Sequence, residues 1–244
     1  MPFGAPDFSN IRKEALVHRL DDLAEAAVRT HVLYTFDRQG DIIYFNDFEN
    51  RTLPAHISTP SQKSRYVIAR GAGLLGGNAL VLKKDPADTG DFSVILRFPL
   101  YSTKTIGFSL LYRRGQYESE SVFDFFIRKP PKFYQGRIVL NHSENKLIIW
   151  DAGQGKVLHT YPHQILSPSV YQFIKFVINI EKERYERVIL GTDVFDAREY
   201  KLATGPTADM PHVVFTLQYK SNSTNADIAF YDSIIVTINE PVSD

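Results

Sequence analysis

Near the N-terminus, hydrophobic residues recur at intervals of three and four positions. Leu16, Leu20, Leu23 and Ala27 follow this spacing, and charged residues occupy many of the positions between them. This period predicts an amphipathic α-helix over residues 11–30. Two interpretations of the helix stay open: it packs against the rest of the chain, or it forms an arm that packs on another subunit.

From residue 32 onward the hydrophobic period changes to two, the period of a β-strand. Residues 32–36 and 42–45 flank an Asp-Arg-Gln-Gly turn segment and predict a hairpin. Further alternating runs, separated by turn-forming residues, predict strands at 66–69, 79–82, 92–98, 106–112, 122–128, 137–141, 146–151, 156–161, 173–180, 187–191, 213–219 and 228–238. Regular strand–turn spacing without further long helices predicts an all-β fold of two packed antiparallel sheets.

The composition removes several classes of partner and site. Lys and Arg together number 28, as do Asp and Glu, so the formal net charge is zero and no global field favours nucleic acid or an anionic membrane. The absence of cysteine excludes disulfides, thiolate metal sites and a cysteine nucleophile. No stretch is long and apolar enough for a transmembrane helix, and no signal peptide is visible. A cytoplasmic location is the default expectation, and secretion is not excluded.

Three segments, in order along the chain, carry a family pattern. Residues 45–54 read Phe-Asn-Asp-Phe-Glu-Asn-Arg-Thr-Leu-Pro, residues 137–191 form a meander of alternating runs, and residues 230–237 read Phe-Tyr-Asp-Ser-Ile-Ile-Val-Thr. Together they resemble the concanavalin A-like lectin/glucanase superfamily and its laminin-G-like members, although Arg51 stands where glycine is common. The resemblance implies a two-sheet antiparallel jelly-roll sandwich over residues 45–240. Residues 1–44 are then an N-terminal extension of helix and hairpin.

Jelly rolls of this kind present one concave sheet face, and the resemblance implies that such a face binds an oligosaccharide or polysaccharide. Sugars are held by an aromatic ring that stacks on their C–H face and by polar groups that contact their hydroxyls. Trp150, the chain's one tryptophan, is the best platform candidate, and its alternative is an ordinary core position. The full set of candidates is Trp150, Asp124, Arg128, Arg137, His142, Lys175, Asn179, Tyr112 and Arg113.

The acidic residues do not suggest a catalytic pair. If one strand ran unbroken from Glu118, then Glu118, Glu120 and Asp124 would share a face. Glu120 and Asp124 would lie about 13 Å apart, whereas glycosidases need about 5–9.5 Å between their two carboxyl groups. The alternative for Asp124 is an ion pair with Arg128 or another cation of the sheet. No catalytic residue is therefore predicted, and no histidine spacing suggests catalytic zinc.

A structural calcium ion is a further implication of the resemblance, because related modules often tie their first and last strands together through one. Asp47, Glu49 and Asp232 match those positions and carry the hard oxygen donors that Ca²⁺ prefers. The alternative is an N-terminal strand that is held by hydrogen bonds alone. No other cofactor is expected.

Three hypotheses for function remain. The first is a non-catalytic glycan-binding protein that uses one sheet face. The second is a structural or assembly protein, in which the helix at 11–30 builds a homo-oligomer. The third is a polysaccharide hydrolase or lyase, which needs two carboxylates at catalytic separation in a cleft.

Overall fold

The computed structural model describes residues 40–50, 55–58, 65–74, 77–86, 92–100, 103–163, 168–221 and 223–242. The predicted helix at 11–30 and the predicted strand at 32–36 lie outside these residues. The helical extension and its role in assembly therefore stay predictions. Within the described part, no helix has the length and apolar character needed to cross a membrane.

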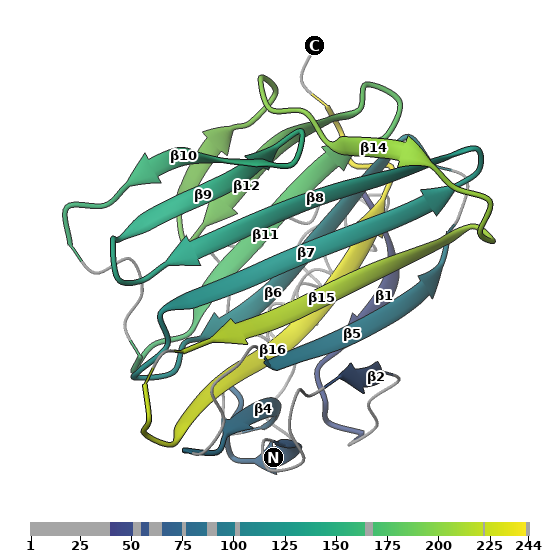
Figure 1. Ribbon diagram of the computed structural model, residues 1–244. Coiled ribbons are helices and arrows are strands. Elements are labelled where there is room, and N and C mark those ends of the chain that lie inside the picture. Colours follow the sequence, from purple (N-terminus) through teal and green to yellow (C-terminus); the bar gives the residue numbers. More distant parts are fainter. Residues whose placement is uncertain are drawn as a thin grey trace, which may run out of the picture. The chain divides into compact units, whose positions relative to one another are not determined.

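The described strands form two sheets, which we call sheet A and sheet B. In spatial order, sheet A contains β13 (Asp193–Asp196), β12 (Arg184–Leu190), β11 (Gln172–Asn179), β6 (Thr105–Arg113), β16 (Asp227–Ile238), β4 (Asn78–Lys84) and β3 (Arg65–Arg70), with β1 (Asp41–Asn46) also paired to β16. Sheet B contains β10 (Gln154–Thr160), β9 (Lys146–Asp151), β8 (Lys132–Asn141), β7 (Glu120–Lys129), β15 (His212–Lys220), β5 (Phe92–Pro99) and β2 (Ala55–Ser58), with β14 (Ala203–Pro206) also paired to β8. Figure 1 looks onto sheet B, with sheet A behind it.

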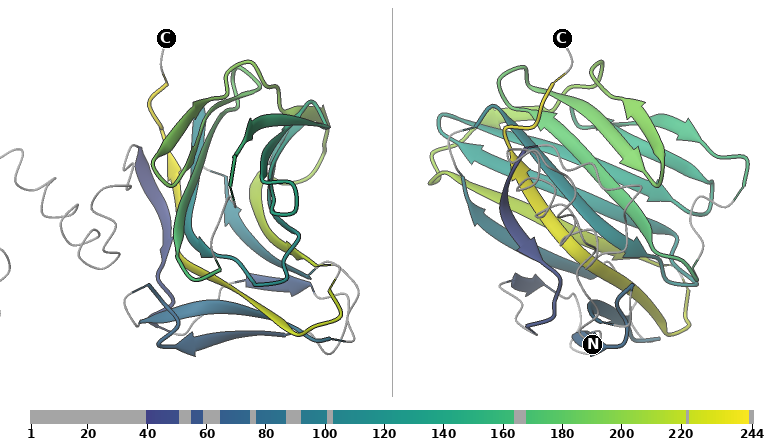
Figure 2. Two further views of the ribbon diagram at one scale, coloured as in Figure 1. Left: turned by 90° about the vertical axis from the view of Figure 1, so that its left-hand side faces the viewer. Right: turned by 180° about the vertical axis from the view of Figure 1, so that it is seen from behind.

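Every strand pair in the two sheets is antiparallel, and the sheets face each other as two layers (Figure 2). β7, β8, β9 and β10 are consecutive in sequence and adjacent in sheet B, whereas the chain changes sheets between β6 and β7. This arrangement confirms the predicted all-β, two-sheet antiparallel sandwich. β1 pairs with β16, so the sandwich also includes residues that precede position 45.

Aromatic side chains fill the space between the sheets. Phe108 of β6 lies 5.5 Å from Phe125 of β7, 5.4 Å from Phe176 of β11 and 5.0 Å from Phe215 of β15, measured between ring centroids. All four rings are fully buried. Because successive side chains of a strand point to opposite faces, the residues next to these phenylalanines point away from the core. The packing of the inner face of sheet B therefore determines which of its residues point outward.

Candidate functional site

The outer face of sheet B carries a row of three predicted residues on three adjacent strands. Asp124 of β7 is paired with Arg137 of β8. Ile138 and Ile149 form the neighbouring pair between β8 and β9, so Arg137 and Trp150 are the next residues along these two strands. Phe125, Ile138 and Ile149 belong to the core, and strand alternation therefore turns the row outward.

The side chains of this row contact one another in sequence. Arg137 Nη2 donates a hydrogen bond to Asp124 Oδ2 at 2.7 Å, and Gln135 Nε2 lies 3.2 and 3.3 Å from the two oxygens of the same carboxylate. The Arg137 guanidinium carbon lies 4.4 Å from the centre of the Trp150 ring, within the range of a cation–π interaction. The partner of Asp124 is thus Arg137 and not Arg128, which pairs with Asp209.

Trp150 is half-buried at this surface and is not part of the core cluster. Its partner on the edge strand β10 is Gly155, which has no side chain to cover the indole. A Cβ placed on Gly155 would lie 3.9 Å from Trp150 Nε1 and 3.5 Å from Ile148 Cγ2, and residues 154–156 aside, no other described heavy atom is within 4 Å of that point. The indole therefore contacts Arg137 on the β8 side and is not covered by a side chain of its β10 partner.

A second aromatic group lies farther along the same face. Phe126 of β7 and Phe133 of β8 are stacked with ring centroids 4.8 Å apart, and the Arg128 guanidinium carbon lies 5.1 Å from the centre of the Phe126 ring. Sequence reasoning missed Phe126, Phe133 and Gln135. Their parity was the available signal, since each is two or four positions from Asp124 or Arg137 on its own strand.

Two predicted binding residues point into the sandwich, and for them the prediction is wrong. His142 has the parity of the core residue Leu140, and its Nε2 lies 2.6 Å from Ser121 Oγ. The Tyr112 hydroxyl lies 2.6 Å from the same Ser121 oxygen and donates to Glu118. Burial lowers the pKa of His142 to about 3 and raises the pKa of Glu118 to about 8. Both groups therefore belong to a polar cluster in the interior.

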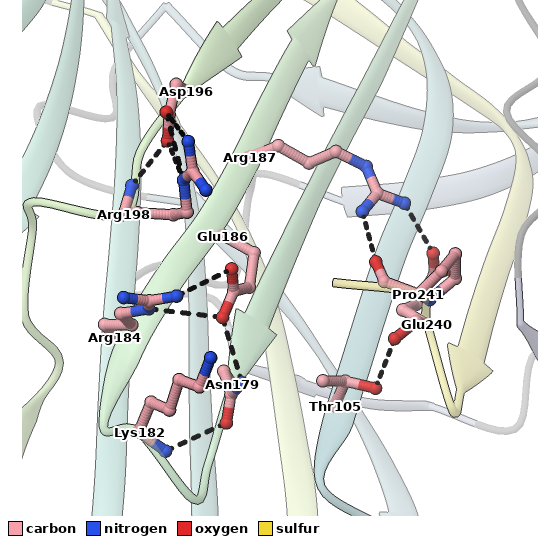
Figure 3. A network of polar contacts seen from close by, with 10 residues as sticks. All are labelled: Thr105, Asn179, Lys182, Arg184, Glu186, Arg187, Asp196, Arg198, Glu240 and Pro241. Atoms are coloured by element: carbon pink, nitrogen blue, oxygen red, sulfur yellow. Dashed lines mark hydrogen bonds and ion pairs between the residues drawn. The ribbon is translucent and has the colours of Figure 1, made fainter. Parts of the chain in front are cut away.

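Three further predicted residues belong to sheet A, so they do not share a face with Trp150. Arg113 lies over Phe230, 3.6 Å from the ring centre. Lys175 is 1% exposed, and its Nζ lies 2.9 Å from Glu240 Oε1. Asn179 donates to Glu186 Oε1 at 2.9 Å within the network of Figure 3. Parity places a side chain on one face of its own sheet, but it does not say which sheet contains the strand.

The acidic residues before and within β7 are divided between the two faces of sheet B. Glu118 precedes the strand and accepts hydrogen bonds from Gly115 N–H at 2.9 Å and Ser121 Oγ at 2.9 Å in the interior. Glu120, the first residue of β7, lies 3.4 Å from Lys220 Nζ. The condition for a common face is therefore not met by Glu118, because β7 begins at Glu120. Glu118 and Asp124 cannot flank one bound ligand.

The residues predicted to bind calcium are engaged in hydrogen bonds. Asn78 N–H donates to Glu49 Oε1 at 2.7 Å, Leu74 N–H donates to Asp232 Oδ2 at 3.0 Å, and Glu49 N–H donates to Asp47 Oδ1 at 3.1 Å. Burial raises the pKa of Asp232, and the charge of Asp47 adds to the effect. Across the described ranges, no three His, Asp or Glu side chains gather as a metal site. These hydrogen bonds join the loop before β4 to Glu49 and Asp232, and calcium binding at these residues stays a prediction.

Comparisons with known proteins show the fold. No family model and no curated protein matches the chain. The endo-β-1,4-glucuronan lyase from the fungus Trichoderma reesei matches with a TM-score of 0.56 and 13% identity, over 81% of this chain and 96% of the lyase chain. The cellulose-induced protein Cip1 matches with a TM-score of 0.54 and 13% identity, over 82% of this chain and 100% of its own. A sialidase matches with a TM-score of 0.50 and 10% identity, but this chain spans only 19% of it. The chain therefore shares its two-sheet jelly-roll fold with these proteins, and this is the fold that its strand motifs predict.

Proposed function

We propose that the protein binds a glycan, without cleaving it, through the outer face of sheet B. The observation that carries this proposal is the contacting row Trp150–Arg137–Asp124 on β9, β8 and β7. It joins an aromatic platform, a planar donor and a carboxylate acceptor, the combination that sugar binding requires. The row crosses two strand spacings, which is about 10 Å. That length suits contact with more than one group of an oligosaccharide.

Each member of the row has a role in this proposal. The indole of Trp150 stacks on the C–H face of a sugar ring that enters beside Gly155. Asp124 accepts hydrogen bonds from sugar hydroxyls, while Arg137 and Gln135 donate to ring or hydroxyl oxygens. The ion pair between Arg137 and Asp124 is 25% and 19% exposed, so it is reachable and adds only about 0.2–1 kcal/mol to stability. Its charges stay balanced when no ligand is bound.

The fold neighbour from T. reesei acts on β-1,4-glucuronan, so the first ligand panel contains glucuronan oligosaccharides. Cello-oligosaccharides and β-1,3-glucan oligosaccharides complete the panel. Binding is measured by isothermal titration calorimetry and by the fluorescence of the one tryptophan. We expect saturable binding to at least one panel member. Trp150→Ala and Asp124→Ala should each weaken it by about tenfold or more, which is about 1.4 kcal/mol. Lys156→Ala, on the same edge of sheet B, is the matched control and should leave affinity unchanged.

Two results would contradict the proposal. The first is binding that the Trp150 and Asp124 variants leave unchanged, or no binding to any member of the panel. The second is turnover: new reducing ends or unsaturated products that the wild-type protein releases from a bound polysaccharide and the Asp124 variant does not. The first result removes the site, and the second replaces a binding function with a catalytic one.

A further inference from the structure

One tyrosine of sheet A reaches across the core to the backbone beneath the proposed site. Tyr185 lies on β12, is completely buried, and packs edge-on against Phe125 with ring centroids 6.1 Å apart. Its hydroxyl accepts a hydrogen bond from Arg137 N–H at 2.7 Å and donates to the Trp150 carbonyl oxygen at 3.0 Å. β12 lies behind β8 and β9 in Figure 1. A single hydroxyl thus contacts the main chain of both stacked residues of the site.

The hydroxyl is placed where β8 changes its neighbour. From Ile138 to Asn141, β8 pairs with β9, whereas from Lys132 to Gln135 it pairs with β14. Arg137 and Trp150 stand at the junction, just beyond the last β8–β9 pair. Gly136 beside them has no side chain because the Phe125 ring occupies that space. Buried backbone groups need partners, and here Tyr185 supplies one to the N–H of Arg137 and one to the carbonyl of Trp150.

We propose that Tyr185 is a positioning residue that sets the separation between Arg137 and Trp150 and thereby the geometry of the glycan site. This inference rests on the proposed function for its consequence in binding, although the contacts themselves do not depend on a ligand. The hydroxyl holds the two strands at a fixed distance from the inside, while the guanidinium and indole meet on the outside. Without the hydroxyl, the Arg137 N–H and the Trp150 carbonyl must form hydrogen bonds with water or with each other, and β8 and β9 shift relative to one another.

The test is Tyr185→Phe, which keeps the ring that packs on Phe125 and removes only the hydroxyl. Tyr231→Phe is the matched control, because Tyr231 is also a completely buried tyrosine of sheet A and its hydroxyl has no hydrogen-bond partner among the described residues. The first readout needs no ligand: the emission maximum of the one tryptophan and its quenching by acrylamide. We expect a shifted maximum and about twofold stronger quenching in Tyr185→Phe, with neither in Tyr231→Phe.

The second readout is affinity for the glycan of the panel that binds the wild-type protein best. Tyr185→Phe should weaken binding by about fivefold or more at unchanged stoichiometry, and Tyr231→Phe should not. A folded Tyr185→Phe protein with wild-type emission, quenching and affinity overturns the inference. If no glycan binds the wild-type protein but Tyr185→Phe still shifts the emission, the proposed function fails and the positioning role stands.

A measurement on the wild-type protein keeps the inference testable if Tyr185→Phe does not fold. Arg137 N–H donates to the Tyr185 hydroxyl, so its amide hydrogen should exchange slowly, at a rate close to that of the ladder residue Ile138. Exchange at the rate of an unprotected amide would overturn the proposal. Slow exchange at Arg137 supports the tyrosine contact independently of any variant.

Discussion

At the residue scale, the site makes a sharp prediction at Gly155, where a side chain would cover the free side of Trp150. Gly155→Leu should weaken glycan binding by about tenfold or more, because the new side chain occupies the place of the stacked sugar. The protein should still fold. The Cβ of the new residue would meet its nearest neighbours at ordinary contact distances of 3.5 and 3.9 Å, and the position lies on the edge strand β10.

Isothermal titration calorimetry and thermal melting together check this prediction. Lys156→Leu is the matched control, since it adds the same side chain to the adjacent position of β10 without facing Trp150. Equal affinity of Gly155→Leu and the wild-type protein would show that the sugar does not stack on this side of the indole. A large fall in melting temperature in Gly155→Leu alone would show that the glycine serves the fold.

The interior cluster predicts a pH dependence of stability with two limbs. His142 has a lowered pKa in the folded protein, so its contribution to stability is present above its ordinary pKa of 6.5 and is lost as the pH falls toward 3. Glu118 has a raised pKa, so its contribution is present below its ordinary value of 4.5 and is lost as the pH rises toward 8. The free energy of unfolding should therefore be highest between these ordinary values and fall on the alkaline side through Glu118.

Glu118→Gln tests the alkaline limb, because the amide keeps the shape of the carboxylic acid and cannot ionise. Chemical denaturation at pH 6 and pH 8 should show a fall on the order of 2 kcal/mol for the wild-type protein and a much smaller fall for the variant. Glu120→Gln is the control, since its carboxylate is only partly buried and pairs with Lys220. The same slope in wild type and Glu118→Gln would show that Glu118 is ionised in the folded protein.

The alternation of inward and outward side chains along each strand determines which part of the site the sequence predicts. It predicts that Asp124 and Arg128 share one face of their strand. It leaves open whether Trp150 faces outward, because Ile148 has the same parity as Trp150 and apolar residues also occupy the other face. It does not reveal that Tyr112 points inward, because nearly every residue of β6 is buried and both faces look apolar. It also cannot reveal Tyr185, whose hydroxyl acts on residues 48 and 35 positions away in sequence.

At the element scale, the question is whether hydrogen bonds alone or also a metal ion hold the loop before β4 against β1 and β16. Glu49 and Asp232 already accept backbone N–H groups of Asn78 and Leu74. We therefore expect the melting temperature to be the same in excess EDTA and in millimolar CaCl₂. Differential scanning fluorimetry checks this. A rise that grows with the logarithm of the Ca²⁺ concentration would show specific binding to the folded state.

Asp232→Asn separates the two accounts of this closure. With hydrogen bonds alone, the amide oxygen still accepts Leu74 N–H, so the variant should lose little stability. With a bound calcium ion, loss of a charged ligand should lower the melting temperature in CaCl₂ but not in EDTA. The comparison is informative because Asp232 is buried beside the charge of Asp47, a repulsion that the neutral variant removes.

At the scale of the whole molecule, the sequence predicts the sandwich well and the distribution of residues between its sheets poorly. Period-two patterning and turn residues are local signals, and they suffice for antiparallel strands. Sheet membership is not local: β6 and β7 are consecutive yet belong to different sheets. The sequence pattern therefore groups Arg113, Lys175 and Asn179 with Trp150, although their strands lie in sheet A. Tertiary pairing, and not strand propensity, decides this level of the structure.

The two outer faces differ in the polar interactions they hold, and this difference predicts separate effects on stability and binding. On sheet A, the fully buried Glu240 carboxylate contacts Lys175 Nζ at 2.9 Å. The same carboxylate contacts Arg187 Nη2 at 2.8 Å, and the Glu240 backbone carbonyl accepts a hydrogen bond from Thr105 Oγ1 at 2.8 Å (Figure 3). On sheet B, the Arg137–Asp124 pair remains partly exposed. Removing one partner of a buried ion pair costs about 3–5 kcal/mol, far more than removing a partner of an exposed pair.

Glu240→Ala should therefore lower the free energy of unfolding by about 3 kcal/mol or more and leave glycan affinity unchanged, because it acts only on sheet A. Asp124→Ala should do the reverse, weakening binding with little loss of stability. Urea denaturation and calorimetric titration of both variants give the four values needed, and Glu181→Ala, which breaks an exposed pair with Lys104, should change neither quantity. If Glu240→Ala weakened binding as much as Asp124→Ala while remaining folded, the ligand would lie on sheet A or across both sheets. The row at Trp150 would then not be the whole binding site.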